Sequence, residues 1–411
     1  MTGRAARLPA YALFAALLAS AGLPIYIHAP KFYVDEYGVS LTALGSVLFG
    51  LRLLDVVQDP ALGWLAQKLR DKRGTAVTVA GAVMALAMLG LFAMPAPVAP
   101  VLWFALMLTL VFSAFSFLTI CFYAQGVAKA DSLPGAGHLT LARWRETGAL
   151  LGVCLASVAP LLLGVGLDRP FAGFAVGFAI LALWATVAMR GEWRAAVLPM
   201  ESGFGTVLRD AQARRLLLIA LVNAAPVAVT STLFLFYVEL ALEAPGWEGP
   251  LLLLFFLAAA AAAPLWGILA ERHGPRRVLL VAMALGIASF GGALLLGPGD
   301  VALFALVCLA SGAVLGGDLT LLPAMFASRM AQISPSAAEG FGLWSFVSKL
   351  TLAFAAVALL PALERAGLQT AAGTSSDTSI SLLIWFYAGV PCALKLLAIA
   401  LLASAKDVET P

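Results

Sequence analysis

The feature that most limits how this chain can fold is a series of long apolar segments that recurs along nearly its whole length. Crossing the hydrocarbon core of a bilayer as a helix takes about 20 apolar residues. About twelve segments of that size lie between polar breaks, and the sequence therefore predicts an all-α membrane protein with twelve transmembrane helices. Their expected spans are 8–29, 41–66, 76–96, 99–128, 140–166, 170–190, 213–241, 248–270, 277–297, 300–330, 338–362 and 380–404.

The composition excludes a water-soluble protein, because 62% of the residues are hydrophobic and only 11% are charged, against about 25% charged in soluble domains. A net charge of +3 is too small to indicate nucleic-acid binding. The four cysteines lie singly in apolar segments and are interpreted as small apolar side chains. The three scattered histidines form no metal-binding pattern and are expected at solvated or interfacial positions.

The basic residues predict the orientation, since Lys and Arg favour cytoplasmic loops. The first apolar segment lacks a cleavage site for a signal peptide and is interpreted as the first helix. We therefore expect both termini in the cytoplasm. The protein is expected to be a monomer in a bacterial inner (plasma) membrane. One set of alternate loops holds Arg4, Arg7, Lys68, Arg70, Lys72, Arg73, Lys129, Arg190, Arg194, Arg209, Arg214, Arg215, Arg272, Arg276, Arg277, Arg329 and Lys406, whereas the opposite set holds only Lys31, Arg169 and Arg365.

An internal repeat relates the second and eighth expected helices. Residues 59–63 (DPALG) parallel residues 263–267 (APLWG), and a basic turn follows each copy at residues 68–74 and 271–277. A repeat at half the chain length predicts two pseudo-symmetric six-helix bundles, at residues 1–190 and 213–411, joined by a polar cytoplasmic linker at 191–212. The basic turns also resemble the loop motif of the major facilitator superfamily, although Gln67 and Glu271 stand where that family often has Asp.

Charged residues inside apolar helices are functional candidates, since each costs about 2.5 to 3.5 kcal/mol at the membrane centre. Asp55 and Asp59 lie four residues apart and Arg52 three before Asp55, so all three share one face of a helix. With Gln58 and a hydroxyl from a neighbouring helix, the two carboxylates can bind Na⁺, or a proton if one carboxyl is held protonated by its twin. The alternative is a structural ion pair between Arg52 and one aspartate.

Two lysines inside expected helices differ in interpretation. Lys349, about two turns into the eleventh helix, can neutralise the carboxylates when the cation is absent, or else extend to the membrane interface. For Lys395, near the cytoplasmic end of the last helix, extension to the interface is the favoured interpretation.

Arg145 and Glu146 form an internal pair, or Arg145 reaches the substrate; the sequence does not choose between the two. Asp318 follows Gly316 and Gly317, so it either lines a cavity or makes a hydrogen bond between closely packed helices.

Two segments carry a more specific resemblance. Residues 32–40 (FYVDEYGVS) with 51–64 (LRLLDVVQDPALGW), and residues 339–349 (EGFGLWSFVSK), resemble the glycoside-pentoside-hexuronide:cation symporter family, the melibiose permease-like branch of the major facilitator superfamily. Its pattern is Tyr-Tyr-Thr-Asp-x-x-Gly-Leu-Ser, then Arg-x-x-Asp-Ala-x-x-Asp-Pro-x-x-Gly, and a Glu-Gly segment that ends in Lys. The resemblance is clear over about a third of the chain and implies the twelve-helix major facilitator fold.

The resemblance assigns roles to individual residues. It implies that Asp55 and Asp59 bind the coupling cation, with Gln58 in place of the usual Asn and Ser116 in place of a threonine. Lys349 matches a lysine of the family, and the resemblance places Arg145 and Tyr123 at the solute site. Thr119 and Asp318 are added to the predicted solute site from their positions in the helices. Lys349 and Arg52 are predicted to take part in coupling because they are charges close to the two carboxylates in the expected helices.

The chain departs from the family at the sugar site. Ala19 and Thr119 stand where the family has two aspartates that bind sugar hydroxyls through charge-assisted hydrogen bonds. The identity of the solute is therefore left open, and vertebrate relatives of the family that carry lysolipids make an amphipathic solute an alternative.

The sequence thus predicts a Na⁺- or H⁺-coupled symporter of a small polar solute, sugar- or glycoside-like, that works by alternating access and needs no cofactor besides the coupling ion. Its expected partners are the solute and the lipid bilayer. The alternatives are a proton-coupled exporter and a lipid or amphiphile transporter of the same fold. An intramembrane enzyme is disfavoured because the chain shows no Ser/His, HExxH or paired-aspartate catalytic motif.

Overall fold

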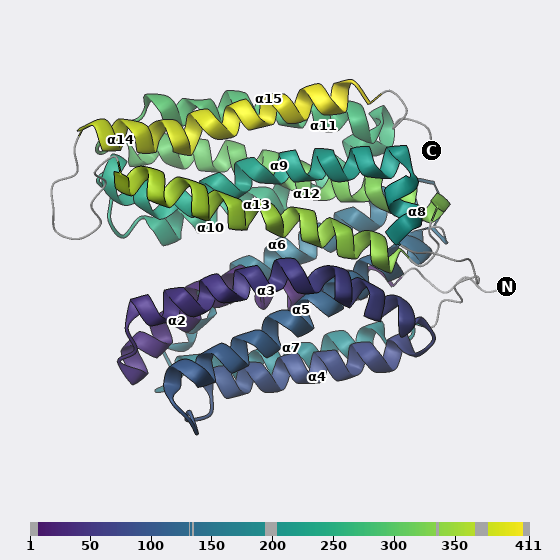
Figure 1. The fold of residues 1–411 in the computed structure, drawn as a ribbon, viewed down its shortest axis with the longest axis horizontal. Coiled ribbons are helices and arrows are strands. Elements are labelled where there is room, and N and C mark those ends of the chain that lie inside the picture. Colours follow the sequence, from purple (N-terminus) through teal and green to yellow (C-terminus); the bar gives the residue numbers. More distant parts are fainter. Residues whose placement is uncertain are drawn as a thin grey trace. The chain divides into compact units, whose positions relative to one another are not determined.

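The computed structural model describes residues 7–130, 132–133, 135–193, 204–333, 337–365 and 377–405, and every regular element in these ranges is helical. The chain divides into two compact units. Unit 1 comprises Met1–Asp210 and Ala327–Phe346, and unit 2 comprises Ala211–Phe326 and Val347–Pro411. Within each unit the long helices run side by side (Figure 1).

The α-helices are α1 (Leu8–Ser20), α2 (Leu23–Tyr37), α3 (Leu41–Lys68), α4 (Arg73–Phe92), α5 (Pro100–Ala130), α6 (Gly137–Leu163), α7 (Pro170–Met189), α8 (Phe204–Arg209), α9 (Ala211–Phe236), α10 (Glu248–His273), α11 (Pro275–Phe290), α12 (Val301–Ile333), α13 (Ala338–Arg365), α14 (Asp377–Ile384) and α15 (Val390–Ala403). Short 3₁₀ segments are η1 (Arg70–Lys72) and η3 (Gly291–Leu295), and π-helical segments are η2 (Tyr237–Ala241) and η4 (Trp385–Gly389).

Nine helices among the described residues are long and apolar enough to cross a membrane. They contain α4, α5, α6, α7, α9, α10, α11, α12 and the segment Thr378–Ala403. Large apolar side chains face outward from many helices; Leu161 is 77% exposed and Leu86 is 66% exposed, as expected of surfaces that contact lipid. The chain is therefore an integral membrane protein. The segments α1–α2, α3 and α13 are not among the nine, so the count of twelve stays a prediction.

The first expected span, 8–29, is wrong as a single helix. The chain forms α1 up to Ser20, breaks at Ala21 and Gly22, and then continues as α2 as far as Tyr37. Gly38 ends α2 with a left-handed φ of 62°, a conformation that costs glycine nothing. Ser40 then begins α3, where its side chain accepts a hydrogen bond from the Ala43 backbone N–H at 3.3 Å.

The two copies of the sequence repeat have similar local structures. α3 contains Pro60 and α10 contains Pro264, each within the last three turns of its helix. Both helices end at the basic turn: α3 passes into η1, and α10 stops at Gly274, whose φ of 85° only glycine adopts easily.

Glycines allow very close packing in unit 1. On α6, a Cβ atom at Gly148 would lie 2.2 Å from the backbone oxygen of Ala12, and one at Gly152 would lie 2.4 Å from that of Ala16. The two backbones therefore touch along one turn of α1 and α6, as in small-xxx-small contacts of membrane helices. This contact fixes the part of α6 that carries Arg145.

Unit 2 has an equivalent contact between α10 and α12. A Cβ atom at Gly312 would lie 2.2 Å from the backbone oxygen of Phe255, and one at Gly316 would lie 2.6 Å from that of Ala259. This close approach positions the adjacent Asp318 in the interior of the unit.

The two π-helical segments η2 and η4 also meet in unit 2. The rings of Tyr237 and Tyr387 stack with centroids 4.1 Å apart, and the Tyr237 hydroxyl donates to the Ala293 backbone oxygen at 2.7 Å.

The predicted linker lies only partly within the described residues. Residues 194–203 are outside them, as are Arg4, Arg194 and Lys406 of the predicted cytoplasmic set. At the end of this stretch, Asp210 accepts two hydrogen bonds from the Arg329 guanidinium within unit 1. The bundle boundaries at 190 and 213 and the cytoplasmic termini stay predictions.

Candidate functional site

The two aspartates of α3 are buried in unit 1. Asp55 is 5% exposed and Asp59 is fully buried, whereas Val57 on the opposite face of the helix is 74% exposed. A helix with one face to lipid turns every third or fourth residue inward, which places both carboxylates and Gln58 on the interior side.

Amide and hydroxyl groups surround Asp55. The Gln58 side-chain amide donates to Asp55 Oδ1 at 2.9 Å, and the Gln58 oxygen accepts from the Ser113 hydroxyl of α5 at the same distance. The predicted hydroxyl, Ser116, is buried on α5 one turn further along. The role of Ser116 stays a prediction. Ser113 was not among the predicted residues, although the helical spacing of three residues from Ser116 places it on the same face.

Asp59 accepts a hydrogen bond from a hydroxyl group that is distant in the sequence. Ser345, in the first turns of α13, donates to Asp59 Oδ2 at 2.5 Å. The segment approaches α3 through two glycines, because a Cβ atom at Gly63 would lie 3.2 Å from the Cα of Gly342. Ser345 was not among the predicted residues; the signal available in the sequence was the pair Gly342 and Ser345, which lie on one face of a helix.

A second polar cluster in unit 1 joins α5 and α6. The Arg145 guanidinium donates to Glu146 Oε1 at 2.7 Å and lies over the Tyr123 ring, with its central carbon 3.9 Å from the ring centroid. The Tyr123 hydroxyl donates to the same Glu146 oxygen at 3.3 Å. The ring of Phe341 lies 5.0 Å from that of Tyr123. Arg145 thus pairs with Glu146, the first of its two predicted interpretations, and is also held by an aromatic face.

This cluster retains unused polar atoms. Arg145 Nη2, Thr119 Oγ1 and Thr147 Oγ1 are buried and have no hydrogen-bond partner within the described part of the chain. Thr119 lies one helical turn before Tyr123, so both face the same side of α5. Ala19, near the end of α1, adds no polar group. The arrangement can bind the hydroxyl or other oxygen atoms of a small molecule, with the aromatic rings as an apolar surface.

Arg52 and Lys349 are the two residues predicted to take part in coupling. The Arg52 side chain lies outside the described residues, so its pairing with an aspartate stays a prediction. Lys349 is half-buried in the part of α13 that belongs to unit 2, and its coupling role also stays a prediction.

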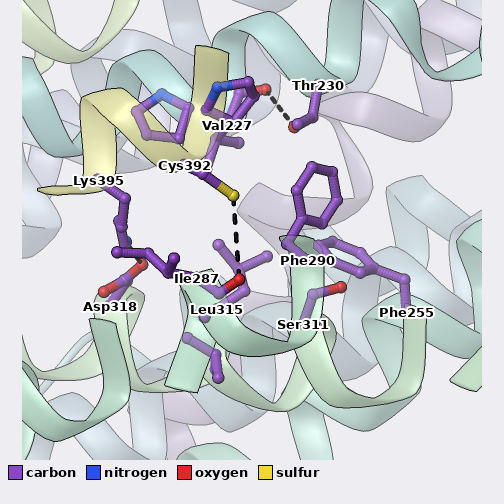
Figure 2. Close-up of a pocket in the computed structure, with 14 residues that line it drawn as sticks. Val227, Thr230, Phe255, Ile287, Phe290, Ser311, Leu315, Asp318, Cys392 and Lys395 are labelled. Atoms are coloured by element: carbon purple, nitrogen blue, oxygen red, sulfur yellow. Dashed lines mark hydrogen bonds and ion pairs between the residues drawn. The ribbon is translucent and has the colours of Figure 1, made fainter. Parts of the chain in front are cut away.

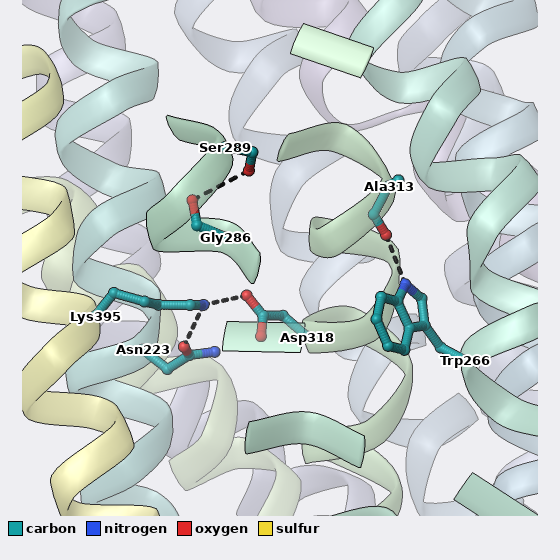
Figure 3. Close-up of polar contacts among 7 residues, drawn as sticks. All are labelled: Asn223, Trp266, Gly286, Ser289, Ala313, Asp318 and Lys395. Carbon is teal, nitrogen blue, oxygen red and sulfur yellow. Dashed lines mark hydrogen bonds and ion pairs between the residues drawn. The ribbon is translucent and has the colours of Figure 1, made fainter. Parts of the chain in front are cut away.

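Asp318 and Lys395 are placed together in the interior of unit 2 (Figure 3). The Lys395 ammonium forms an ion pair with Asp318 Oδ2 and donates to the Asn223 side-chain oxygen at 2.6 Å. The expectation that Lys395 extends to the membrane interface is wrong, because only 7% of the residue is exposed. The Asp318 carboxylate on α12 pairs with the ammonium and offsets part of the cost of burying it.

The described residues contain no group of three His, Cys, Asp or Glu side chains that could hold a metal ion. Oxygen atoms from Asp55, Asp59, Gln58, Ser113 and Ser345 are the donors available for a hard monovalent cation.

Comparisons with known proteins agree on a transporter fold. The family model described as MFS/sugar transport protein matches residues 9–406. No curated protein sequence matches the chain. Among solved structures, a bacterial homologue of the iron transporter ferroportin in an outward-facing state has a TM-score of 0.68 and 16% identity, over 97% of this chain and 99% of that one. A structure described as a bacterial homologue of ferroportin in an outward-facing state with soaked iron has a TM-score of 0.67 and 16% identity, over 96% of this chain and 98% of that one.

Proposed function

The chain belongs to the MFS/sugar transport protein family of membrane transporters, and on that premise we propose that it is a cation-coupled symporter of a small polar solute. The observation that carries this proposal is the pair of buried carboxylates on α3, Asp55 and Asp59, whose hydrogen-bond partners include an amide and a serine hydroxyl. A membrane transporter of this fold works by rocking one half against the other around a central site.

The cation site follows from the cost of burying charge. Each carboxylate in the membrane interior costs about 2.5 to 3.5 kcal/mol, and a bound Na⁺ or proton offsets that cost. Gln58 and Ser113 supply neutral oxygen atoms beside Asp55, and Ser345 supplies one beside Asp59. Ser116 stays a candidate ligand on the same helix as Ser113. Oxygen donors of this kind suit Na⁺.

The solute class follows from the cluster around Arg145. A guanidinium stacked on Tyr123, with a spare N–H and the Thr119 hydroxyl nearby along α5, suits a solute with several oxygen atoms and one apolar face. A sugar or glycoside has this chemistry. Ala19 and Thr119 stand where the melibiose permease-like family has its two sugar-binding aspartates. The particular solute is therefore left open, and an amphiphile is the alternative.

The remaining predicted roles are part of the same proposal. Lys349 and Arg52 are proposed to take part in coupling, and Asp318 is proposed to contact the solute. The likeness to the iron transporter homologue rests on 16% identity, so iron is not carried over to this chain. We expect a monomer in a bacterial inner membrane with both termini in the cytoplasm.

The proposal is tested by cation-dependent stabilisation of the purified protein. A ligand that binds only the native state stabilises it by about 2.7 kcal/mol at 100 times its dissociation constant. We expect Na⁺, or a fall in pH, to raise the melting temperature of the wild type, and K⁺ or choline at equal ionic strength to have no such effect. Asp55→Asn and Asp59→Asn should each abolish the increase.

Asp71→Asn is the matched control, because the Asp71 side chain is 90% exposed and lies in the loop after α3. If neither Na⁺ nor pH separates wild type from the α3 variants, the carboxylates are structural and the protein is an uncoupled facilitator. A proton-coupled exporter is distinguished by direction: efflux from vesicles that collapses with a protonophore, without cation-driven uptake.

A further inference from the structure

Unit 2 contains a buried cluster of three polar side chains, each from a different helix. Asn223 on α9, Asp318 on α12 and Lys395 on α15 are 6%, 7% and 7% exposed. The Lys395 ammonium lies between the other two side chains and contacts an oxygen of each (Figure 3). Charged groups held this way inside a membrane domain are expensive and typically mark ion or proton pathways.

Asp318 and Lys395 lie among helices whose described middle parts carry few other charges. The middle parts of the helices packed around them have no further Asp, Glu, Lys, Arg or His. These stretches are residues 216–236 of α9, 249–270 of α10, 278–290 of α11, 301–317 and 319–328 of α12, and the rest of α15. On these stretches and on η2 and η4, the other titratable groups are Tyr237, Glu239, Cys308, Tyr387 and Cys392, and α13 carries Lys349. The state of the pair therefore depends mainly on its own two members.

The carboxylate of Asp318 has an unused oxygen. Oδ2 pairs with Lys395, whereas Oδ1 is buried and has no hydrogen-bond partner within the described residues. Leaving a buried charged oxygen without a partner costs at least about 1 to 3 kcal/mol, so water or a proton is expected there.

A cavity lies beside the pair and is large enough for water. Its volume is about 80 Å³, and both Asp318 and Lys395 line it. In Figure 2 these two residues lie at one side of the cavity, and Phe255 and Phe290 at the other. One water needs about 10 to 15 Å³ of such volume, so several fit.

We propose that Asp318, Lys395 and Asn223 form a proton-binding site inside unit 2, in which Asp318 is the group that accepts the proton. A hydronium ion in the cavity transfers H⁺ to Asp318 Oδ1: one of its O–H bonds breaks and leaves a water molecule, a new O–H bond forms on the carboxylate, and Asp318 becomes a neutral acid. Lys395 keeps its own proton and its hydrogen bond to Asn223. The buried group changes from net zero charge to net +1.

Proton binding at this site has a structural consequence. The ion pair joins α12 to α15, and its loss leaves an uncompensated ammonium, which is strongly unfavourable in the interior. The packing of α15 against α9 and α12 therefore depends on whether Asp318 is protonated. Trp266 can report this change, because its indole donates to the Ala313 oxygen of α12 at 2.7 Å and its ring packs on Gly317.

The site is tested on the full-length protein in lipid by infrared difference spectroscopy between alkaline and acid pH. Protonation of a carboxylate produces a carboxylic acid C=O stretching band. We expect one such band to be lost in Asp318→Asn and retained in Asp71→Asn and in Asp59→Asn. Adding Na⁺ should not alter it, which separates this site from the carboxylates of α3. Failure of the cation proposal on α3 would leave the result unchanged.

Lys395→Met provides an independent test if Asp318→Asn does not fold. Removing a neighbouring positive charge favours the neutral acid, so the band should appear at a higher pH than in the wild type. In protein labelled with 5-fluorotryptophan, the Trp266 fluorine signal, assigned with Trp266→Phe, should shift over the same pH range.

A difference spectrum that is identical in wild type and Asp318→Asn, or a band whose pH range is unaffected by Lys395→Met, would overturn the proposal.

Discussion

Gly148→Ala is the substitution whose effect follows most directly from the geometry of unit 1. The added methyl group would lie 2.2 Å from the backbone oxygen of Ala12 and 2.6 Å from its Cα. These are backbone atoms, so no side chain can rotate away. α1 must move back from α6 by about 1 Å before the contact becomes ordinary. Overpacking of this kind costs about 1 to 3 kcal/mol.

The matched control is Gly177→Ala on α7, where an added Cβ atom meets nothing within 4 Å. Both substitutions gain about 0.5 to 1 kcal/mol in helix propensity, so the difference between the two variants isolates the packing cost. We expect Gly177→Ala to be neutral or slightly stabilised and Gly148→Ala to be less stable than it by about 1 to 3 kcal/mol. The assay is reversible unfolding in mixed micelles titrated with SDS, with thermal melting as a check.

The same substitution should also disturb the solute cluster. Arg145 lies three residues before Gly148, and its stacking on Tyr123 depends on the position of α6. Solute uptake should therefore weaken while stabilisation by Na⁺, which depends on α3, persists. If Gly148→Ala and Gly177→Ala unfold at the same SDS fraction, the close approach of α1 and α6 does not exist in solution and the reasoning is refuted.

Two smaller substitutions test the contacts in unit 1. Ser345→Ala removes a hydrogen bond to the Asp59 carboxylate, which is worth about 1.5 to 3 kcal/mol for a charged acceptor. The Na⁺ concentration for half-maximal stabilisation should therefore change at least several-fold. Ser348→Ala is the control and should leave that concentration unaltered. Tyr123→Phe keeps the ring beneath Arg145 and should retain solute uptake into proteoliposomes. Tyr123→Leu removes the ring and should reduce uptake at least tenfold, which corresponds to about 1.4 kcal/mol or more. Equal uptake by the two variants would contradict a role for the stacking.

Much of the local structure could be predicted from the sequence, because a membrane helix is recognisable from one continuous apolar segment. The positions of most long helices agree with the expected spans to within several residues. Helical spacing also predicted that Gln58 lies beside Asp55, which it does. The contact between Gln58 and Asp55 does not itself show cation binding, so a cation at Asp55 and Asp59 stays a prediction. The break at Gly22 was missed because the apolar segment continues across it.

The contacts between distant segments could not be predicted in the same way. Ser345 is 286 residues from Asp59, and Lys395 is 77 residues from Asp318. Neither pairing has a local signal, since it depends on which helix faces which. Lys395 was assigned to the interface because a lone lysine near a helix end usually extends there. Only the position of α12 reveals that an aspartate lies within reach.

Glycine positions explain why the polar side chains stay buried. Membrane helices lack a hydrophobic driving force for association, so close backbone contact must hold them together. Gly63 lies four residues after Asp59 in unit 1, and Gly316 two residues before Asp318 in unit 2; each contacts backbone atoms of a neighbouring segment. Lipid cannot enter where backbones touch, and a carboxylate next to such a contact must find its partners within the protein. The glycines thus select the sites where charge can be buried, and a carboxylate one turn from a backbone contact is the pattern to seek in related chains.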